Sequence, residues 1–208
     1  IIEKEIVYKD KNKESDKENW FFFNKDKMRI IGGKNRSRII NEVGIPTTKP
    51  TADNVREAVF NSLYDVNGAV VLDLFAGSGS YGLEALSRGA KSSHFNDNHP
   101  KAIATIKENI NLLGEKENCF VTPYEYNQAL FHIRNKDLKY DLVFLDPPYE
   151  FESDDYNYII FGLRDNLNEG AKIVLELHKN QEFELTNNFK IIKDQIYGIK
   201  RIIILKKI

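Results

Sequence analysis

The 208-residue sequence predicts an α/β fold built on a mostly parallel sheet. Short apolar runs rich in β-branched residues alternate with stretches in which apolar residues recur at helical spacing. Strands and helices in regular alternation indicate a parallel sheet that helices cover on both faces. The last two apolar runs meet at Tyr197-Gly198, and so short a connection predicts an antiparallel hairpin. We therefore expect a seven-stranded sheet that ends in an antiparallel hairpin.

The elements follow one another without an internal repeat, as in a single main domain. The first is an amphipathic helix at 51–64, with Val55, Val59 and Phe60 on one side and Thr51 as a suitable N-cap. Strands are expected at 70–76, 92–97, 118–123, 140–146, 171–177, 189–195 and 198–206. Further helices are expected at 80–88, 100–113, 126–135 and 155–166. The expected domain spans 28–208, with a basic segment at 28–50, a helical segment at 51–66 and the core at 68–208.

Composition argues against a membrane-spanning protein and against a disulfide-stabilised one. Hydrophobic residues make up 41% of the chain and charged residues 29%, as in ordinary globular domains. No apolar run approaches the roughly 20 residues that span a bilayer. Cys119 is the single cysteine, so neither an internal disulfide nor a cysteine cluster for a metal can form. We expect no metal site, a reducing compartment such as the cytoplasm, and a monomer.

Residues 1–27 differ in kind from the rest of the chain. They hold seven lysines and seven acidic residues, but no glycine and no proline. The one methionine of the chain, Met28, follows directly. We expect a mobile extension that is either foreign to the domain or part of a longer precursor, in which case an organelle is the alternative compartment.

A cluster of positive charge follows Met28. Between residues 28 and 50 there are five basic residues and one acidic residue, Glu42. The basic residues are Arg29, Lys34, Arg36, Arg38 and Lys49. The segment has the charge of a polyanion-binding surface, although a solvated lysine-rich face has the same composition.

A glycine-rich loop predicts a site for an adenosine cofactor. Gly77, Gly79 and Gly82 follow an apolar strand and open a helix, where glycines allow a tight turn and helix N–H groups can meet a ligand. Asp97 ends the next strand about 20 residues later, where a carboxylate can accept from ribose hydroxyls. Near the third strand, Glu125 can accept from the adenine amine, with Tyr126 beside it. The same predicted site includes Phe75, Ala76, Ser78 and Asn98.

Asp73 distinguishes between the two cofactor classes that share this loop. An acidic side chain just before the glycines repels a pyrophosphate, whereas it can hold the amino group of a methionine moiety. The sequence therefore favours S-adenosylmethionine as the cofactor. An oxidoreductase with a nicotinamide cofactor is the less favoured alternative.

The tetrapeptide Asp146-Pro147-Pro148-Tyr149 ends the fourth apolar run and predicts the chemistry. The carboxyl ends of parallel strands meet at the ligand-binding edge of a sheet, so this tetrapeptide faces the glycine loop. Asp146 and the Pro147 carbonyl can accept the two N–H bonds of an exocyclic amine. Tyr149 can stack on the base, which is worth roughly 1 to 3 kcal/mol. Such a grip fits guanine, adenine or cytosine in an unpaired or flipped-out nucleotide, and less well a glutamine side chain, for which the related motif begins with asparagine. A proline-stiffened strand exit is the structural alternative.

Three blocks of the sequence resemble the bacterial 16S ribosomal RNA guanine-N2 methyltransferases of the RsmD type, between about residues 29 and 201. The blocks are Arg29-Ile30-Ile31-Gly32-Gly33 with Arg36 and Arg38, then Lys49-Pro50-Thr51-Ala52-Asp53-Asn54-Val55-Arg56-Glu57 leading to Phe60, and then 73–79 continuing through 82–90. The resemblance implies a class I, Rossmann-like methyltransferase fold. It also implies methyl transfer from S-adenosylmethionine to N2 of one guanine in 16S ribosomal RNA, within a small-subunit particle.

The resemblance further implies a basic N-terminal hairpin that contacts RNA, with Thr51 and Arg56 beside the cofactor and the target pocket. The implied RNA-binding residues are Arg29, Lys34, Arg36, Arg38, Lys49 and Arg56. The chain departs from the family pattern at Lys49, where arginine is usual, and at His94 and Asn96. Methylation of adenine N6 or cytosine N4 in DNA is the alternative, against which stands the lack of a separate target-recognition domain.

Overall fold

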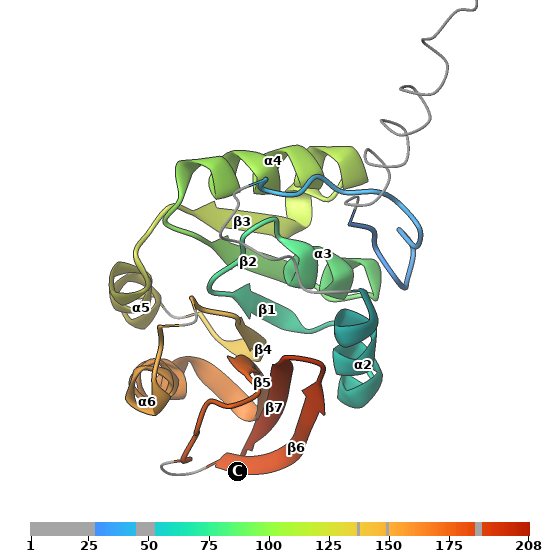
Figure 1. Cartoon of the computed structure of the whole chain (residues 1–208). Coiled ribbons are helices and arrows are strands. Elements are labelled where there is room, and N and C mark those ends of the chain that lie inside the picture. Colours follow the sequence, from blue (N-terminus) through green and yellow to red (C-terminus); the bar gives the residue numbers. More distant parts are fainter. Residues whose placement is uncertain (1–27, 45–52, 137, 149, 186–188) are drawn as a thin grey trace, which may run out of the picture.

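The computed structural model describes residues 28–44, 53–136, 138–148, 150–185 and 189–208 (Figure 1). The predicted extension at 1–27 and three predicted site residues, Lys49, Thr51 and Tyr149, lie outside the described residues. Within these ranges, no helix is both long enough and apolar enough to cross a membrane.

The described strands form one sheet in the order β3-β2-β1-β4-β5-β7-β6 (Figure 1). They are β1 (Val70–Asp73), β2 (Ser92–Asn96), β3 (Cys119–Thr122), β4 (Tyr140–Leu145), β5 (Leu167–His178), β6 (Phe189–Tyr197) and β7 (Lys200–Lys207). Strands β1 to β5 are parallel, and β7 is antiparallel to both β5 and β6. The predicted parallel sheet with an antiparallel C-terminal hairpin is confirmed.

Helices cover both faces of the sheet, and alternate strand residues divide the core between them. The helices are α2 (Asp53–Leu63), α3 (Ser80–Ser87), α4 (Pro100–Leu113), α5 (Tyr126–Arg134) and α6 (Ser153–Leu163), with 3₁₀ turns at Lys116–Asn118 and Arg164–Asn166. Helices α2, α3 and α4 share one core with strand residues such as Val71 and Phe144. Helices α5 and α6 share the other core with Leu72 and Val143. Successive strand residues point to opposite faces, so this division assigns each strand side chain to a face.

Several element boundaries differ from the predicted ones, and β1, predicted to reach residue 76, ends at Asp73. Helix α6 begins at Ser153 because Glu152 and Asp155 form a capping box, in which each side chain accepts from the backbone N–H of the other residue. The predicted helix at 155–166 ends as a 3₁₀ turn from Arg164. Strand β5 starts earlier than predicted, at Leu167, and reaches the main ladder through a register shift against β4.

The basic N-terminal segment forms a short hairpin without long strands. Its ladder is an isolated antiparallel bridge between Arg29 and Ile39. The Ile30 backbone N–H donates to the Arg38 carbonyl at 2.9 Å, and the Ile40 N–H donates to the Met28 carbonyl at 2.8 Å. We call residues 28–40 the basic hairpin.

Strand β6 is an edge strand whose side chains stay largely accessible. Ile191, Ile192 and Ile196 are exposed, and Lys190 and Lys193 lie among them. The pairing with β7 shifts register between Ile191 and Lys193, which indicates a β-bulge at Ile192.

Gly82→Ala is expected to lower the free energy of unfolding by about 1 to 3 kcal/mol, because overpacking a filled core costs that much. A Cβ atom at Gly82 would lie 2.5 Å from Ser93 Oγ and closer still to the Phe95 ring of β2. Urea unfolding measures the loss. Gly162→Ala in α6 is the matched control and should cost less, because its Cβ would meet movable side-chain ends of Arg134 and Leu130. An equal loss at the two glycines would contradict the close approach of α3 to β2.

Candidate active site

The glycine loop turns sharply between β1 and α3. Gly77 and Gly79 have φ angles of 54° and 81°, in the left-handed region that favours glycine. Gly79 is the N-cap of α3 and brings no side-chain cap, and in the first turn of the helix the Gly82 N–H donates to the Asp73 carboxyl group. A side chain at Gly77 would meet nothing within 4 Å, so there is space directly beside the main chain. The loop is therefore shaped for a ligand that approaches the backbone closely.

Asp97 fixes this loop from the end of β2. Its carboxylate accepts from the backbone N–H of Gly77 at 2.8 Å and from that of His99 at 2.8 Å. Burial raises the pKa of the Asp97 carboxyl group, and these hydrogen bonds oppose the rise. Asn98 donates to Glu125 Oε1 at 2.8 Å. The structure thus brings Asp97, Asn98 and Glu125, three predicted cofactor residues, to the ends of β2 and β3.

Two further predicted residues, Phe75 and Tyr126, meet in an aromatic cluster. Their ring centroids are 6.0 Å apart, and the Phe151 ring lies 5.4 Å from Phe75 and 5.3 Å from Tyr126. These half-buried rings give the loop after β1 an apolar neighbour on the α5 and α6 side of the sheet.

Asp73 is the buried acid of the site, at the end of β1. Its Oδ2 accepts from the Gly82 backbone N–H at 3.1 Å. Burial raises the pKa of the Asp73 carboxyl group to about 7; the Gly82 bond opposes this, and the charges of Asp146 and Asp97 add to it. A buried carboxyl group that ionises reluctantly gains most from a cationic partner. These residues therefore fit a ligand that brings an ammonium group to the glycine loop.

Asp146 follows β4 at the same edge of the sheet. Asp146 is half-buried, Pro147 is buried and Pro148 is exposed. In strand order, β2, β1 and β4 are followed or ended by Asp97, Asp73 and Asp146. Adjacent strands lie about 4.8 Å apart, so the three carboxyl groups are within reach of one elongated ligand.

Sequence reasoning missed a buried ionic cluster beside Asp146. Glu176 of β5 accepts from the Tyr81 hydroxyl at 2.9 Å and pairs with Lys200 of β7. Glu176 and Lys200 are both buried. The signal that could have revealed them is an ionisable residue within, or directly before, an apolar strand run.

His94 and Asn96, which are unusual in a buried strand, belong to one hydrogen-bonded network. His94 Nε2 lies 2.8 Å from Thr122 Oγ1, which also donates to Asn96 Oδ1 at 2.9 Å. Asn96 Nδ2 donates to the carbonyls of Leu74 at 3.1 Å and Tyr124 at 3.0 Å. Burial lowers the pKa of His94 to about 4, so the ring is neutral near pH 7. The network ties the ends of β1 and β3 to β2 beside the cofactor loop.

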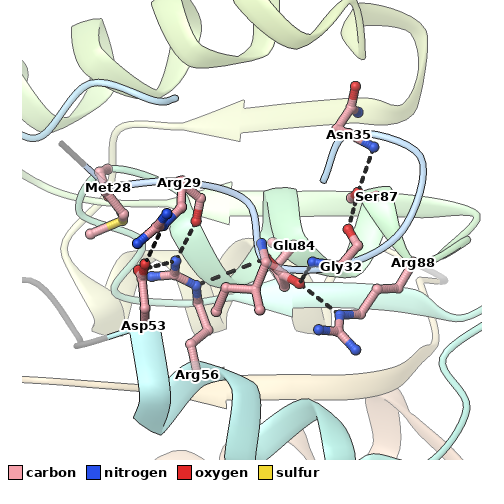
Figure 2. A network of polar contacts seen from close by, with 12 residues as sticks. Met28, Arg29, Gly32, Asn35, Asp53, Arg56, Glu84, Ser87 and Arg88 are labelled. Carbon is pink, nitrogen blue, oxygen red and sulfur yellow. Dashed lines mark hydrogen bonds and ion pairs between the residues drawn. The ribbon is translucent and has the colours of Figure 1, made fainter. Parts of the chain in front are cut away.

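The basic hairpin packs on α3 through the carboxylate of Glu84 (Figure 2). Glu84 is fully buried and accepts from the backbone N–H groups of Ile31 at 2.7 Å and Gly32 at 2.8 Å. Its Oε1 also pairs with Arg88 Nε at 2.7 Å. One turn on, Ser87 Oγ accepts from the Asn35 backbone N–H at 2.9 Å. Helix α3 begins at the glycine loop, so the loop and the hairpin share one support.

Arg56 lies inside the protein, although the sequence analysis places it among the RNA-binding residues. Its side chain is 0% exposed, and Nη2 donates to the Arg29 carbonyl at 2.6 Å and to Asp53 at 3.0 Å. Its Nε lies 4.0 Å from Glu84 Oε2 (Figure 2). This burial corrects the predicted RNA contact, because the buried Glu84 and the Arg29 carbonyl draw the guanidinium inward. Arg56 instead positions the basic hairpin.

The other predicted RNA-binding residues that the structure describes lie on the surface of the basic hairpin. Arg29, Lys34, Arg36 and Arg38 are all exposed. Lys34 pairs with Glu115 at 2.9 Å, and Arg38 donates to the Leu112 and Leu113 carbonyls near the end of α4. These contacts fix the direction in which the hairpin presents its charge.

A cavity of about 380 Å³ lies at the opposite, amino-terminal edge of the strands. It is lined by Leu63, Asp65, Val66, Asn67, Gly68, Ala69, Asp141, Leu142, Gly170 and Lys172. None of the predicted site residues lines it, so it is separate from the candidate active site.

Comparison with known proteins gives concordant matches. Residues 28–206 match the family described as Conserved hypothetical protein 95. The ribosomal RNA small subunit methyltransferase D of Haemophilus influenzae is 32% identical over 177 residues, which cover 84% of this chain and 91% of that protein. The protein of the same name from Buchnera aphidicola is 31% identical over 179 residues, covering 86% and 92%.

Solved structures share the fold. A conserved hypothetical protein from Streptococcus pyogenes has a TM-score of 0.67 and 33% identity, covering 74% of this chain and 95% of that one. A hypothetical protein from Thermus thermophilus has a TM-score of 0.73 at 24% identity, covering 87% and 99%.

Asp73→Asn is expected to remove a loss of stability that the wild-type protein suffers as the pH rises. The folded-state pKa of about 7 lies above the ordinary 3.8, so between these values the folded protein keeps a proton that the unfolded chain releases. Wild-type stability should therefore fall between pH 5 and pH 8, by roughly 2 to 3 kcal/mol from this group. Urea unfolding of both proteins at the two pH values, without added ligand, measures the difference. A difference in stability that does not change with pH would contradict this account.

Glu84→Gln is expected to lower the free energy of unfolding by about 3 to 5 kcal/mol, because it leaves buried Arg56 without its buried counter-charge. Glu169→Gln is the matched control, since Glu169 is 83% exposed and pairs with Lys207 at 3.3 Å. Its loss should stay below about 1 kcal/mol. Comparable losses in urea unfolding would show that the Glu84 contacts do not anchor the hairpin.

Proposed function

Because the chain belongs to the family described as Conserved hypothetical protein 95, we propose that it methylates ribosomal RNA with S-adenosylmethionine as the methyl donor. The proposed target is the N2 amine of one guanine in small-subunit ribosomal RNA. We further propose that the protein acts as a monomer in the cytoplasm on RNA within a small-subunit particle.

The row of Asp97, Asp73 and Asp146 along one sheet edge is the observation that supports this most. In this proposal Asp97 accepts from ribose hydroxyls beside the glycine loop. Asp73 receives an ammonium group, and Asp146 receives an amine of the target base. The row therefore orders donor and acceptor along the sheet, from β2 through β1 to β4.

S-adenosylmethionine supplies, when bound, a methyl group on a positively charged sulfur. The residues of the chain do the positioning. Asp146 and the Pro147 carbonyl accept the two N–H bonds of the exocyclic amine, which directs its lone pair toward the β1 side of the site. The bound cofactor would supply the methyl group to this nitrogen and would keep the sulfur from which the methyl group departs. The nitrogen then loses one proton, for which the Asp146 carboxylate is the adjacent acceptor.

Alignment of amine and methyl group is the main source of rate in such a displacement and can supply about 7 to 11 kcal/mol. Neither a metal nor a protein nucleophile has a part in the proposed step. The exposed basic residues of the hairpin, with Lys49, are the proposed contacts to the RNA backbone. Because α3 supports both the basic hairpin and the glycine loop, the hairpin surface has a fixed position relative to the site.

Asp146→Asn is expected to lower the rate of methyl transfer by at least about 100-fold, because the amine loses its anionic acceptor and its alignment. The substrate is a small-subunit particle reconstituted from unmodified RNA transcript, with naked transcript in parallel. Mass spectrometry of the digested RNA should find N2-methylguanosine, and mapping should place it at one nucleotide. Glu169→Gln, far from the site, should keep the wild-type rate.

Two results would overturn parts of this assignment. Methyladenosine or methylcytidine as the product would overturn the choice of base. Full activity in a folded Asp146→Asn protein would overturn the role of Asp146.

A further inference from the structure

The ionic cluster of Glu176 and Lys200 continues the row of charged side chains beyond Asp146. The β4–β5 register pairs Leu145 with Leu175, so the next residues, Asp146 and Glu176, lie side by side. The β5–β7 register pairs Glu176 with Ile202, and Lys200 lies two residues away along β7 on the same face. In strand order the row thus extends from Asp146 on β4 to Glu176 on β5 and Lys200 on β7.

All of these side chains belong to the α3 side of the sheet. Phe144, Val174 and Ile202 share one core, and the charged residues lie two positions from them along the same strands. Tyr81 of α3 packs on Phe144 with ring centroids 4.6 Å apart and planes at 16°, and its hydroxyl donates to Glu176. Glu176 therefore has a fixed orientation at the edge of the site.

The stability of the fold does not require charged side chains at positions 176 and 200. The Glu176 and Lys200 side chains are only 3% and 10% exposed. Taking two charges out of water costs several kcal/mol per ion before their attraction is counted, and apolar residues of similar size often serve stability as well or better. The Asp146 charge also acts on Lys200, whose pKa burial lowers and Asp146 raises. The pair is thus electrostatically part of the proposed site.

The hydrogen-bonding edge of guanine differs from those of the other amine-bearing bases. Beside its exocyclic N2 amine, guanine carries an N1–H donor and then the O6 acceptor. Adenine and cytosine have an unprotonated ring nitrogen, an acceptor, beside their amines. A carboxylate next to the amine-binding group therefore suits guanine and repels the other two bases.

We propose that Glu176 and Lys200 select guanine, with Glu176 accepting from N1–H and Lys200 donating to O6 while Asp146 holds the N2 amine. This assignment rests on the proposed function and explains its choice of base. The order acceptor, acceptor, donor along β4, β5 and β7 matches the order of groups on the guanine edge. Because the pair is nearly dry, an unmatched base group there stays unsatisfied, which is how polar sites discriminate strongly.

The test replaces the target guanine, once mapped, by 2,6-diaminopurine in the same RNA. This analogue keeps the 2-amino group but has an acceptor at N1 and an amine at C6. For the wild-type protein, kcat/KM for methylation should fall about 10- to 100-fold on this replacement. The ratio of kcat/KM for guanine to kcat/KM for 2,6-diaminopurine measures this preference. In Glu176→Gln this ratio should be at least tenfold smaller than in the wild-type protein, because glutamine offers a donor as well as an acceptor. Loss of folded protein lowers both rates equally and leaves the ratio unchanged, so the readout is independent of stability.

Lys200→Met tests the second contact with a pair of analogues that differ at C6 alone. The wild-type protein should prefer 2-aminopurine, which has hydrogen at C6, over 2,6-diaminopurine, whose C6 amine meets the lysine. The methionine variant should lose this preference. Glu169→Gln is the matched control on β5 and should show the wild-type ratios.

The outcomes separate this inference from the proposed function. Guanine methylation with an undiminished ratio in Glu176→Gln overturns the inference and leaves the proposed function in place. A wild-type protein that methylates no guanine overturns the proposed function, and the inference with it.

Discussion

The burial of carboxyl groups at one edge of the sheet, where the charges of neighbouring carboxylates add to the cost at Asp73, is the constraint to which the rest of the site responds. Parallel strands deliver Asp97, Asp73 and Asp146 to that edge, and burial leaves each with less water to screen its charge. Backbone N–H groups of Gly77, His99 and Gly82 offset part of this cost. The part of this cost that the N–H groups do not offset favours ligands that are positively charged or donate hydrogen bonds. The same electrostatics thus account for the loop geometry, the raised pKa of Asp73 and the chemistry that the site suits.

Another carboxylate, that of Glu84, connects this site to the basic hairpin. It satisfies two backbone N–H groups of the basic hairpin and lies against two arginines, one of them fully buried. Glu84 lies on α3, the helix that begins at the glycine loop. One helix therefore positions both the exposed basic residues of the hairpin and the glycine loop beside the buried acidic residues. Precision in such a site comes from supports of this kind rather than from the residues that meet the ligand.

The sequence was informative where function depends on local patterns and weak where it depends on tertiary partners. Apolar periodicity predicted the strands and helices, and the spacing from the glycines to Asp97 placed both at one edge. The burial of Arg56 was not predictable, because its counter-charge Glu84 lies on another helix. Glu176 escaped notice because its importance comes from register with β4. The capping box at Glu152 and Asp155, which starts α6 at Ser153, was also missed, because a Glu and Asp pair does not match the usual Ser/Thr and Glu/Gln signature.

The outer edge of the sheet has its own consequence for the behaviour of the protein in a crowded cell. An exposed strand with apolar side chains is a template on which other chains can add by backbone pairing, the first step toward aggregation. On β6, the bulge at Ile192 interrupts the regular ladder, and Lys190 and Lys193 would have to be desolvated by any added strand. Geometry and charge therefore both disfavour pairing of another chain with the exposed isoleucines of β6, the last strand of the described sheet.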